Sequence, residues 1–315
     1  MKQYFGIDIG GTAVKLGIVD ETGKVLCKGE QSVNFDGYQT PVLDTVRKAA
    51  KEFLTAQAIP VENLSGIGVS ATGQIDSRKG IVAGTCGNFP NYIGSPIKAA
   101  LEQDFGLPVT VANDANCMTL GEVWVGGAQG YTDVIGVTLG TGVGGGVIVN
   151  GKVIDGTHGA GGEIGHITVD RHETAACGCG KHGCLEQYSS ATGVVRCMKK
   201  LLDENPDTPC ILRGTEFAAK DVFDAARNGD ALAAREVDEM TDTLGLALAS
   251  IAATTDPEMF MIGGGVSRAG EVLFAPLREH FKVYAFKSCR ETPIVPAILG
   301  NDAGIYGSVR LIVGE

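Results

Sequence analysis

The chain has 315 residues, which is enough for about two domains of ordinary size. Its 26 Lys and Arg residues against 37 Asp and Glu residues give a net charge of −11, and an acidic chain without a basic run disfavours nucleic acids and membranes as partners. Hydrophobic residues make up 44% and charged residues 20% of the chain, a composition that excludes a largely disordered protein. The 46 glycines are unusually many and indicate tight turns or close backbone approaches.

Targeting signals and disulfides are not expected. Asp8 interrupts the first apolar stretch, and the longest uncharged run, 134–151, is rich in glycine and fits two strands better than a membrane span. The nine cysteines are an odd number, and three of them lie within 177–184. Reduced thiols with one metal cluster fit this pattern better than a disulfide framework. Because no secretory signal is expected, we expect a cytoplasmic protein.

Apolar segments with the spacing of strands alternate with amphipathic segments in the first third of the chain. The predicted strands cover 4–9, 14–20, 24–30, 66–70 and 109–112, and the predicted helices cover 40–56 and 95–105. Such alternation predicts an α/β protein with a parallel or mixed sheet.

Helical patterns dominate the rest of the chain. The predicted helices cover 115–123, 185–202, 218–227, 231–255 and 301–313, with a strand at 258–262. We expect the last helix to pack back on the first lobe, which lacks a late helix of its own.

A comparison of the chain with itself reveals a repeat. A shift of 130 residues places 5–10 over 135–140 and 18–20 over 148–150, and after a two-residue gap 23–26 falls on 151–154. The unit is a strand, a glycine turn, a second strand and a reverse turn. Chance similarity between glycine-rich hairpins is the alternative. Otherwise the repeat predicts two α/β lobes of common design that face each other across a cleft, each with one glycine turn.

The glycine turns offer sites for phosphate. The chain has no G-x-x-x-x-G-K-[ST] motif, and although 140–145 fits G-x-G-x-x-G, a strand follows it where a dinucleotide site requires a helix. Both turns place Gly beside Thr, at Gly11-Thr12 and at Thr141-Gly142. Backbone amides and a hydroxyl at each turn could hold an anion.

Three carboxylate or amide side chains lie beside predicted strand ends. Asp8 would repel a phosphate at the first turn unless a Mg²⁺ ion lay between them, and Lys15 adds a nearby positive charge. The simpler alternative is that Asp8 only caps the turn. Asn113 and Asp114 stand between a strand and a helix, where they could cap the helix or take part in catalysis.

The cysteine cluster has the spacing of a metal site. Cys177, Cys179 and Cys184 follow a C-x-C-x4-C pattern, and with one imidazole they would make a closed, structural zinc site. His166 precedes the cluster by eleven residues, and spacing alone leaves His172 and His182 as rival ligands.

Taken together, these motifs resemble the ROK family of sugar kinases and related repressors over essentially the whole chain. Asp8-Ile9-Gly10-Gly11-Thr12 and the segment 138–146 resemble the two phosphate motifs of the family. Glu163-x-x-His166, followed by Cys177-x-Cys179-Gly180-x-x-Gly183-Cys184-x-Glu186, is similar to its sugar and zinc signature.

The resemblance implies a fold and a domain division. The fold is a hexokinase/actin-like (ribonuclease H-like) duplicated α/β structure with a central cleft. Residues 1–113 with 301–315 would form the small lobe, and 114–300 the large lobe with a zinc-binding loop at 156–186.

The resemblance also implies an ATP-dependent hexose kinase with Asp114 as the base, Mg²⁺ with the ATP, and a structural Zn²⁺ ion. It implies a homodimer or homotetramer as well. The implied zinc ligands are His166, Cys177, Cys179 and Cys184. The implied sugar-binding residues are Gly73, Asn88, Asn113, Asp114, Glu163, His166 and Glu186. The implied nucleotide and Mg²⁺ residues are Asp8, Gly10, Gly11, Thr12, Lys15, Gly140, Thr141, Gly142, Gly264 and Gly265.

Two loops give conflicting indications of the sugar. Ser70-Ala71-Thr72-Gly73 is closer to N-acetylmannosamine kinases, whereas Gly87-Asn88-Phe89-Pro90 resembles a glucokinase loop. We expect transfer to the 6-hydroxyl of glucose, with N-acetylmannosamine or N-acetylglucosamine as the alternative. A sugar-sensing repressor of the same family is disfavoured, because the first phosphate motif begins at Asp8 and leaves no room for a helix-turn-helix.

Overall fold

The computed structural model describes residues 1–84 and 90–313, and the chain falls into two compact units. Unit 1 comprises Met1–Tyr131, Gly146–Gly162 and Ile298–Glu315, and unit 2 comprises Thr132–Gly145 and Glu163–Ala297. The division into lobes that the resemblance implies, 1–113 with 301–315 and 114–300, stays a prediction. None of the described helices is long and apolar enough to cross a membrane.

Unit 1 contains a five-stranded mixed sheet. Its strands are β1 (Gln3–Ile9), β2 (Ala13–Asp20), β3 (Val25–Ser32), β4 (Leu64–Ala71) and β7 (Val109–Asn113), in the order β3-β2-β1-β4-β7. Neighbouring strands among β1, β2 and β3 are antiparallel, whereas β4 runs parallel to both β1 and β7. The carboxyl ends of β1, β4 and β7 therefore meet at one edge of the sheet, where α/β enzymes place their functional residues.

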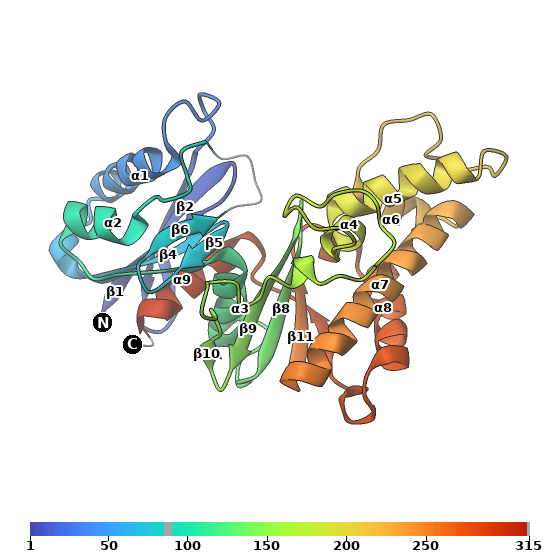
Figure 1. Ribbon diagram of the computed structural model, residues 1–315. Coiled ribbons are helices and arrows are strands. Elements are labelled where there is room, and N and C mark those ends of the chain that lie inside the picture. The colour runs from blue at the N-terminus through green and yellow to red at the C-terminus, as the bar shows by residue number, and fades with distance from the viewer. Residues whose placement is uncertain (85–89, 314–315) are drawn as a thin grey trace. The chain divides into compact units, whose positions relative to one another are not determined.

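Helices cover both faces of this sheet (Figure 1). One face is covered by α1 (Val42–Ala56) and α2 (Ile97–Phe105), and the other by α3 (Asp114–Val125) and α9 (Ala303–Val313). Because successive side chains of a strand point to opposite faces, Phe5 stacks on Phe53 of α1 with a centroid separation of 5.8 Å, while Gly6 faces Ile305 of α9. The last helix thus packs on the first sheet, as expected.

Short elements complete unit 1. Two antiparallel strands, β5 (Gln74–Asp76) and β6 (Ile81–Gly84), pair with each other, and 3-10 turns occur at η1 (Val61–Asn63) and η5 (Gly300–Asp302). The sequence analysis predicted none of these short elements.

The second five-stranded sheet repeats the strand order of the first. Its strands are β8 (Val134–Leu139), β9 (Val143–Val149), β10 (Lys152–Val153), β11 (Met259–Gly263) and β12 (Ile294–Pro296), in the order β10-β9-β8-β11-β12. The boundary between the units falls within β9. The match of β8, β9 and β10 with β1, β2 and β3 confirms the repeat.

The helices of unit 2 follow the predicted order with one correction. They are α4 (Glu186–Ser189), α5 (Ala191–Glu204), α6 (Ala219–Arg227), α7 (Ala231–Thr255) and α8 (Glu271–Tyr284), with 3-10 turns at η2 (Ile164–His166), η3 (Val266–Ala269) and η4 (Lys287–Cys289). The single helix predicted over 185–202 was wrong. The helix breaks at Ser190, whose extended backbone and side-chain oxygen, which accepts from the Gly193 amide, begin α5 as a new helix. The sequence analysis did not predict α8.

A buried carboxylate fixes the segment that leads into α9. Glu122 of α3 is fully buried. Its Oε1 accepts hydrogen bonds from the amides of Ile298 at 2.7 Å and Leu299 at 2.8 Å, and its Oε2 accepts from the Gly127 amide at 2.9 Å. These charge-assisted bonds attach the chain just before α9 to α3.

Replacing Glu122 with Ala is expected to lower the free energy of unfolding by about 3 kcal/mol, because three backbone amides lose a charged acceptor. Urea unfolding followed by circular dichroism measures the loss. Glu258→Ala is the matched control, because Glu258 also accepts from two backbone amides, those of Thr132 and Asp133, but at an exposed position. Equal losses of unfolding free energy in the two variants would show that burial adds nothing to the contribution of the Glu122 hydrogen bonds.

Candidate active site

Asp8 lies at the carboxyl end of β1, among polar groups of unit 1. The Ser70 hydroxyl donates to its Oδ1 at 2.7 Å, and the Lys15 ammonium lies 3.6 Å from its Oδ2. Lys15 also donates to the Asn301 carbonyl oxygen at 3.0 Å. Burial raises the pKa of Asp8, while the bonds from Ser70 and Lys15 act in the opposite direction. Asp8 is therefore a carboxylate whose charge depends on its partners.

The first turn of α9 packs directly on this carboxylate. A Cβ atom at Gly304 would overlap the carboxyl group of Asp8, so that only glycine fits this close approach. The positive end of a helix dipole stabilises a nearby negative charge. The sequence analysis missed both Ser70 and Gly304 as neighbours of Asp8. For Ser70 the signal was its position at the end of a strand, but for Gly304 no signal in the sequence pointed to Asp8.

Asn113 caps helix α3. Its Oδ1 accepts from the amides of Ala115 at 2.9 Å and Asn116 at 3.3 Å, and its Nδ2 donates to the Gly73 carbonyl at 2.9 Å and to Asp114 Oδ1 at 3.0 Å. An amide side chain has two donor and two acceptor positions, so these four bonds use its full capacity. Asn113 thereby joins Gly73 to Asp114, and its contact with a sugar stays a prediction.

Asp114 is the first residue of α3 and is half-buried. It receives hydrogen bonds from the Ala115 amide at 2.9 Å, from Asn113, and from the Thr72 hydroxyl. Burial and the negative charge of Asp8 raise the pKa of Asp114 to about 6 despite these bonds. A carboxyl group with a pKa near the working pH can both accept and release a proton, as a general base must.

In each glycine turn the first amide donates to a carbonyl oxygen later in the same turn. The Gly10 amide donates to the Ala13 carbonyl at 2.9 Å, and the Gly140 amide donates to the Gly142 carbonyl at 3.0 Å. Within 1–84 and 90–313, the next two amides of each turn, at 11–12 and at 141–142, have no hydrogen-bond acceptor. Each turn therefore presents a pair of amides of the kind that binds phosphate oxygens.

Two further predicted nucleotide residues, Gly264 and Gly265, follow β11. Since β8 and β11 are parallel and pair through Thr138 and Gly263, their carboxyl ends meet at one edge of the second sheet. A Cβ atom at Gly264 would overlap the backbone of Leu139, and its φ of 85° is in the left-handed region. The structure therefore brings Gly264 to the glycine turn that begins at Gly140.

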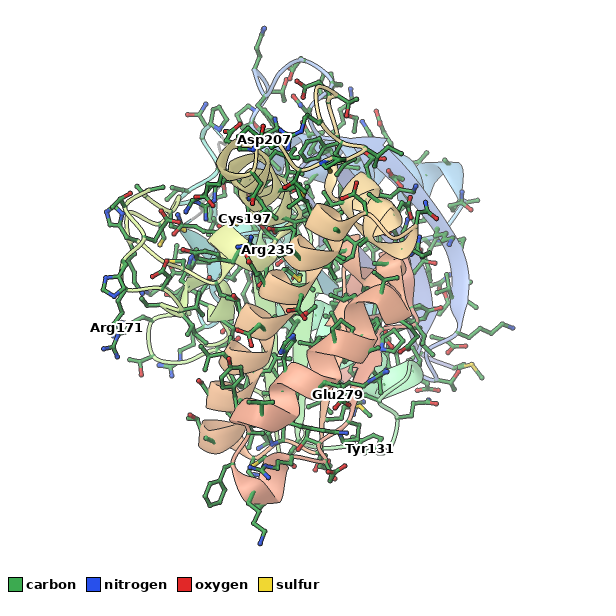
Figure 2. All side chains as sticks on the ribbon, turned by 90° about the vertical axis from the view of Figure 1, so that its right-hand side faces the viewer. Tyr131, Arg171, Cys197, Asp207, Arg235 and Glu279 are labelled. Carbon is green, nitrogen blue, oxygen red and sulfur yellow. The ribbon has the colours of Figure 1, made fainter. Side chains whose placement is uncertain are left out.

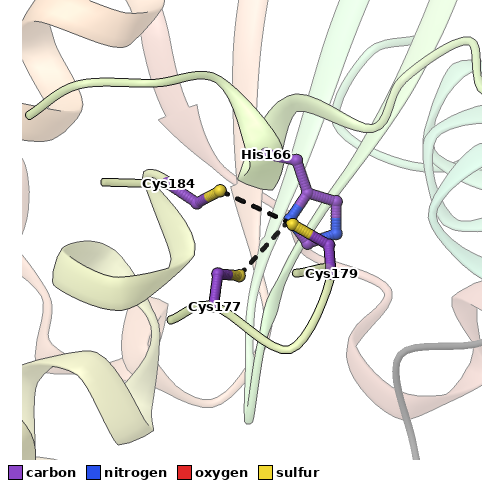
Figure 3. Close-up of side chains that lie close together, drawn as sticks. All are labelled: His166, Cys177, Cys179 and Cys184. Atoms are coloured by element: carbon purple, nitrogen blue, oxygen red, sulfur yellow. Dashed lines mark hydrogen bonds between the residues drawn. The ribbon is translucent and has the colours of Figure 1, made fainter. Parts of the chain in front are cut away.

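The four residues predicted as zinc ligands lie together in unit 2 (Figure 3). All four candidate ligand atoms, from His166, Cys177, Cys179 and Cys184, lie within 4.8 Å of one another. The Sγ atoms of Cys179 and Cys184 are 3.7 Å apart, and the Cys177 Sγ lies 3.8 Å from His166 Nδ1. Tetrahedral zinc with Zn–S bonds of about 2.3 Å separates its sulfur ligands by about 3.8 Å. The donor set and its spacing thus fit zinc. The rival ligands His172 and His182 are exposed and are not part of this group.

Two glutamates lie beside the cluster. The Oε2 of Glu163 is 3.8 Å from His166 Nε2, on the side of the ring that faces away from the cysteines. The Oε2 of Glu186 accepts from the Val143 amide at 3.0 Å, and a Cβ atom at Gly142 would overlap that carboxylate. Glu186 therefore connects the second glycine turn to the metal-binding loop. Asn88, predicted to contact the sugar, lies outside the described residues.

Comparisons with known proteins agree with these features. The family model described as the ROK family matches residues 4–315. The chain is 38% identical to a glucokinase of Halalkalibacterium halodurans, over 99% of this chain and 95% of that protein, and 36% identical to a glucokinase of Thermotoga maritima, over 98% and 97%.

Among solved structures, a ROK family glucokinase from Streptomyces griseus in complex with glucose and AMPPNP has 33% identity and a TM-score of 0.78, covering 98% of both chains. These findings confirm the expected hexokinase/actin-like fold class. The protein belongs to the ROK family.

Proposed function

We propose that this protein is an ATP-dependent hexose kinase that transfers the γ-phosphoryl group of ATP to the 6-hydroxyl of glucose. The observation that carries the proposal is Asp114, a carboxyl group at the start of α3 whose pKa is raised to about 6 by burial and by the charge of Asp8. The names of the relatives and the AMPPNP and glucose in the related structure support the same activity.

Asp114 acts as the general base in this proposal. Its carboxylate accepts the proton of the sugar hydroxyl while that oxygen attacks the γ-phosphorus in line with the leaving ADP. Asn113 and Thr72 hold the carboxylate through their hydrogen bonds. A positioned base contributes about 10²–10⁴-fold to such a rate.

Within unit 1 the free amides at 11–12 offer donors for phosphate oxygens of ATP, and within unit 2 the amides at 141–142 offer the same, with Gly264 and Gly265 as the residues for contact with the nucleoside. Asp8 and Lys15 fit a site for Mg·ATP, because a carboxylate and an ammonium are paired at the end of β1. Bound Mg²⁺ neutralises charge on the transferred phosphoryl group. The Ser70 bond keeps one oxygen of Asp8 occupied and leaves the other facing Lys15.

Zinc has a structural part in the proposal. The donor set of three thiols and one imidazole fits a closed site, which leaves no position for a reacting group. Because His166 Nδ1 faces Cys177, its Nε2 is the nitrogen that faces Glu163. We infer that Nε2, Glu163 and Glu186 hold sugar hydroxyls, with the ring orientation of His166 fixed by the metal.

The alternative substrate is an N-acetylhexosamine, because Ser70-Ala71-Thr72-Gly73 is closer to N-acetylmannosamine kinases. Release of ADP from Mg·ATP with glucose, N-acetylmannosamine, N-acetylglucosamine and fructose in parallel distinguishes the substrates. Glucose is expected to give the largest kcat/KM. Greater turnover of an N-acetylhexosamine would make that sugar the proposed substrate. No turnover of any of the four sugars by folded, zinc-loaded protein would contradict the proposed kinase activity.

We also propose a cytoplasmic homodimer or homotetramer, as the resemblance implies. Sedimentation velocity measures the number of chains directly, and a single monomeric species at micromolar concentration would contradict that part.

The acid limb of the pH profile reports on Asp114. Only the ionised carboxylate accepts a proton, so kcat/KM is expected to fall as the pH drops through about 6 and to be about tenfold lower at pH 5 than its plateau. The measurement is kcat/KM for glucose between pH 5 and pH 8, with circular dichroism showing that the protein stays folded. A flat profile across this range would exclude a base with a raised pKa.

A further inference from the structure

Unit 2 has a groove that the proposed kinase reaction does not use. It encloses about 450 Å³ and is lined by residues of α5, α7 and α8 and by Tyr188 of α4. Cys197 of α5 and Arg235 of α7 mark this face in Figure 2. Leu201 and Met240 give the groove apolar walls, and most of its charged residues are acidic.

Glu236 is the unusual residue of this groove. It lies on the buried side of α7 with only 2% of its surface exposed, and it lines the cavity. Among the residues that the structure describes, no hydrogen bond or ion pair is made by its carboxyl group. A buried polar group without a partner is costly, and a buried carboxylate more so.

The other acidic residues of the groove differ from Glu236, because each has a partner. Glu239 pairs with Arg235 at 2.7 Å, and Asp238 pairs with His280 at 2.9 Å. Asp242 accepts from the Tyr284 hydroxyl at 2.8 Å, and Glu204 lies 3.9 Å from Lys200. The groove therefore has an acidic entrance in which each carboxyl group has a polar partner, and one deep carboxyl group that has none among the described residues.

We propose that this groove binds a linear aliphatic amine, whose ammonium group pairs with Glu236 and whose methylene chain lies along Leu201 and Met240. An anionic ligand would meet five carboxyl groups, and a neutral apolar ligand would leave Glu236 without a partner. A metal ion fits less well, because the described residues contain a single cluster of candidate metal ligands, the one at His166. The volume also exceeds what one ion fills.

Proton release accompanies this binding. Burial, and next the charge of Glu239, raise the pKa of Glu236 to about 8, against the attraction of Arg196. At pH 7 the free groove therefore holds a mostly neutral Glu236, which ionises when the ammonium group binds. Affinity is expected to rise about tenfold between pH 7 and pH 9, while the amine stays charged. The titratable and charged side chains around Glu236 are Tyr188, Arg196, Cys197, Lys200, Glu204, Arg235, Asp238, Glu239, Asp242 and His280.

Isothermal titration of the full chain with spermidine at pH 7 and 0.15 M KCl tests the proposal. Two buffers with different ionisation enthalpies report the protons released. We expect one site per chain, release of nearly one proton, and an affinity at least tenfold weaker in Glu236→Gln. The amide is the isostere of the neutral acid, so this variant should fold. Glu279→Gln is the control, because Glu279 is an exposed acid of α8 outside the groove.

Equal affinity in wild type and Glu236→Gln would overturn the proposal, as would the absence of binding at millimolar spermidine. If Glu236→Gln and Glu279→Gln weakened the binding of spermidine equally, the binding would be general attraction to an acidic surface. That result would contradict a specific site at Glu236. If Glu236→Gln were unfolded, the proton release by the wild-type chain would still decide, because surface attraction releases no proton from a buried acid. The titration reads binding directly, so its outcome is independent of the kinase proposal.

Discussion

Replacement of Asp114 with Asn is expected to lower kcat for glucose phosphorylation by about 10²–10⁴-fold and to leave glucose binding within a few-fold of the wild type. The amide retains an oxygen that can accept from the Ala115 amide, so the start of α3 should be preserved. It cannot accept the hydroxyl proton. Steady-state kinetics with titration calorimetry of glucose separates these two effects.

Asp8→Asn is the informative companion to this variant. The side chain of Asp8 sits among Ser70, Lys15 and the first turn of α9, and in our proposal it acts on Mg·ATP. We therefore expect its loss to raise the KM for Mg·ATP, whereas Asp114→Asn lowers kcat. An Asp114→Asn enzyme with more than about a tenth of wild-type kcat would remove Asp114 from the role of base.

Loss of one thiol from the metal cluster is expected to have the second large effect. Cys179→Ser should reduce zinc from about one ion per chain to well below that, lower Tm by at least about 5 °C, and weaken glucose binding. The physical reason is that the described segment from Glu163 to Glu186 contains one 3-10 turn, two isolated β-bridges and the first residue of α4, so cross-linking by a metal replaces a hydrophobic core there. Atomic absorption, thermal unfolding and glucose titration measure the three effects.

Cys210→Ser is the matched control, because Cys210 is a half-buried thiol of the same unit outside the cluster. Its zinc content and glucose affinity should equal those of the wild type. Wild-type protein without bound zinc would contradict the ligand assignment. Unchanged glucose affinity in a zinc-free Cys179→Ser protein would show that the metal does not orient His166.

The repeat was the most informative feature of the sequence. Equivalent strands such as β1 and β8 could be predicted because each carries the same alternation of apolar residues and glycine before its turn. The break between α4 and α5 could not be predicted from the sequence, because the helical pattern continues through Ser190. Only the hydrogen bond from the Gly193 amide to the Ser190 side chain shows that a new helix begins. Pairing of β5 with β6 depends on contacts that three- and four-residue segments do not encode.

The candidate site shows the same division. The cysteine spacing and the position of Asp114 were visible in the sequence, because ligand spacing and strand ends are local features. The neighbours of Asp8 come from β2, β4 and α9, far apart along the chain, and only the fold brings them together. Asn113 shows the opposite case, since both interpretations of its position were open and the structure gives it the capping bonds.

Identification of the product tests the central claim most directly. Zinc-loaded protein would be incubated with Mg·ATP and uniformly ¹³C-labelled glucose, and the product analysed by ³¹P and ¹³C NMR. The account predicts glucose 6-phosphate in equal amount to the ADP formed, with phosphorus coupled to C6, and almost none from Asp114→Asn. Formation of ADP with free phosphate but no sugar phosphate, or phosphorylation at another hydroxyl, would contradict it.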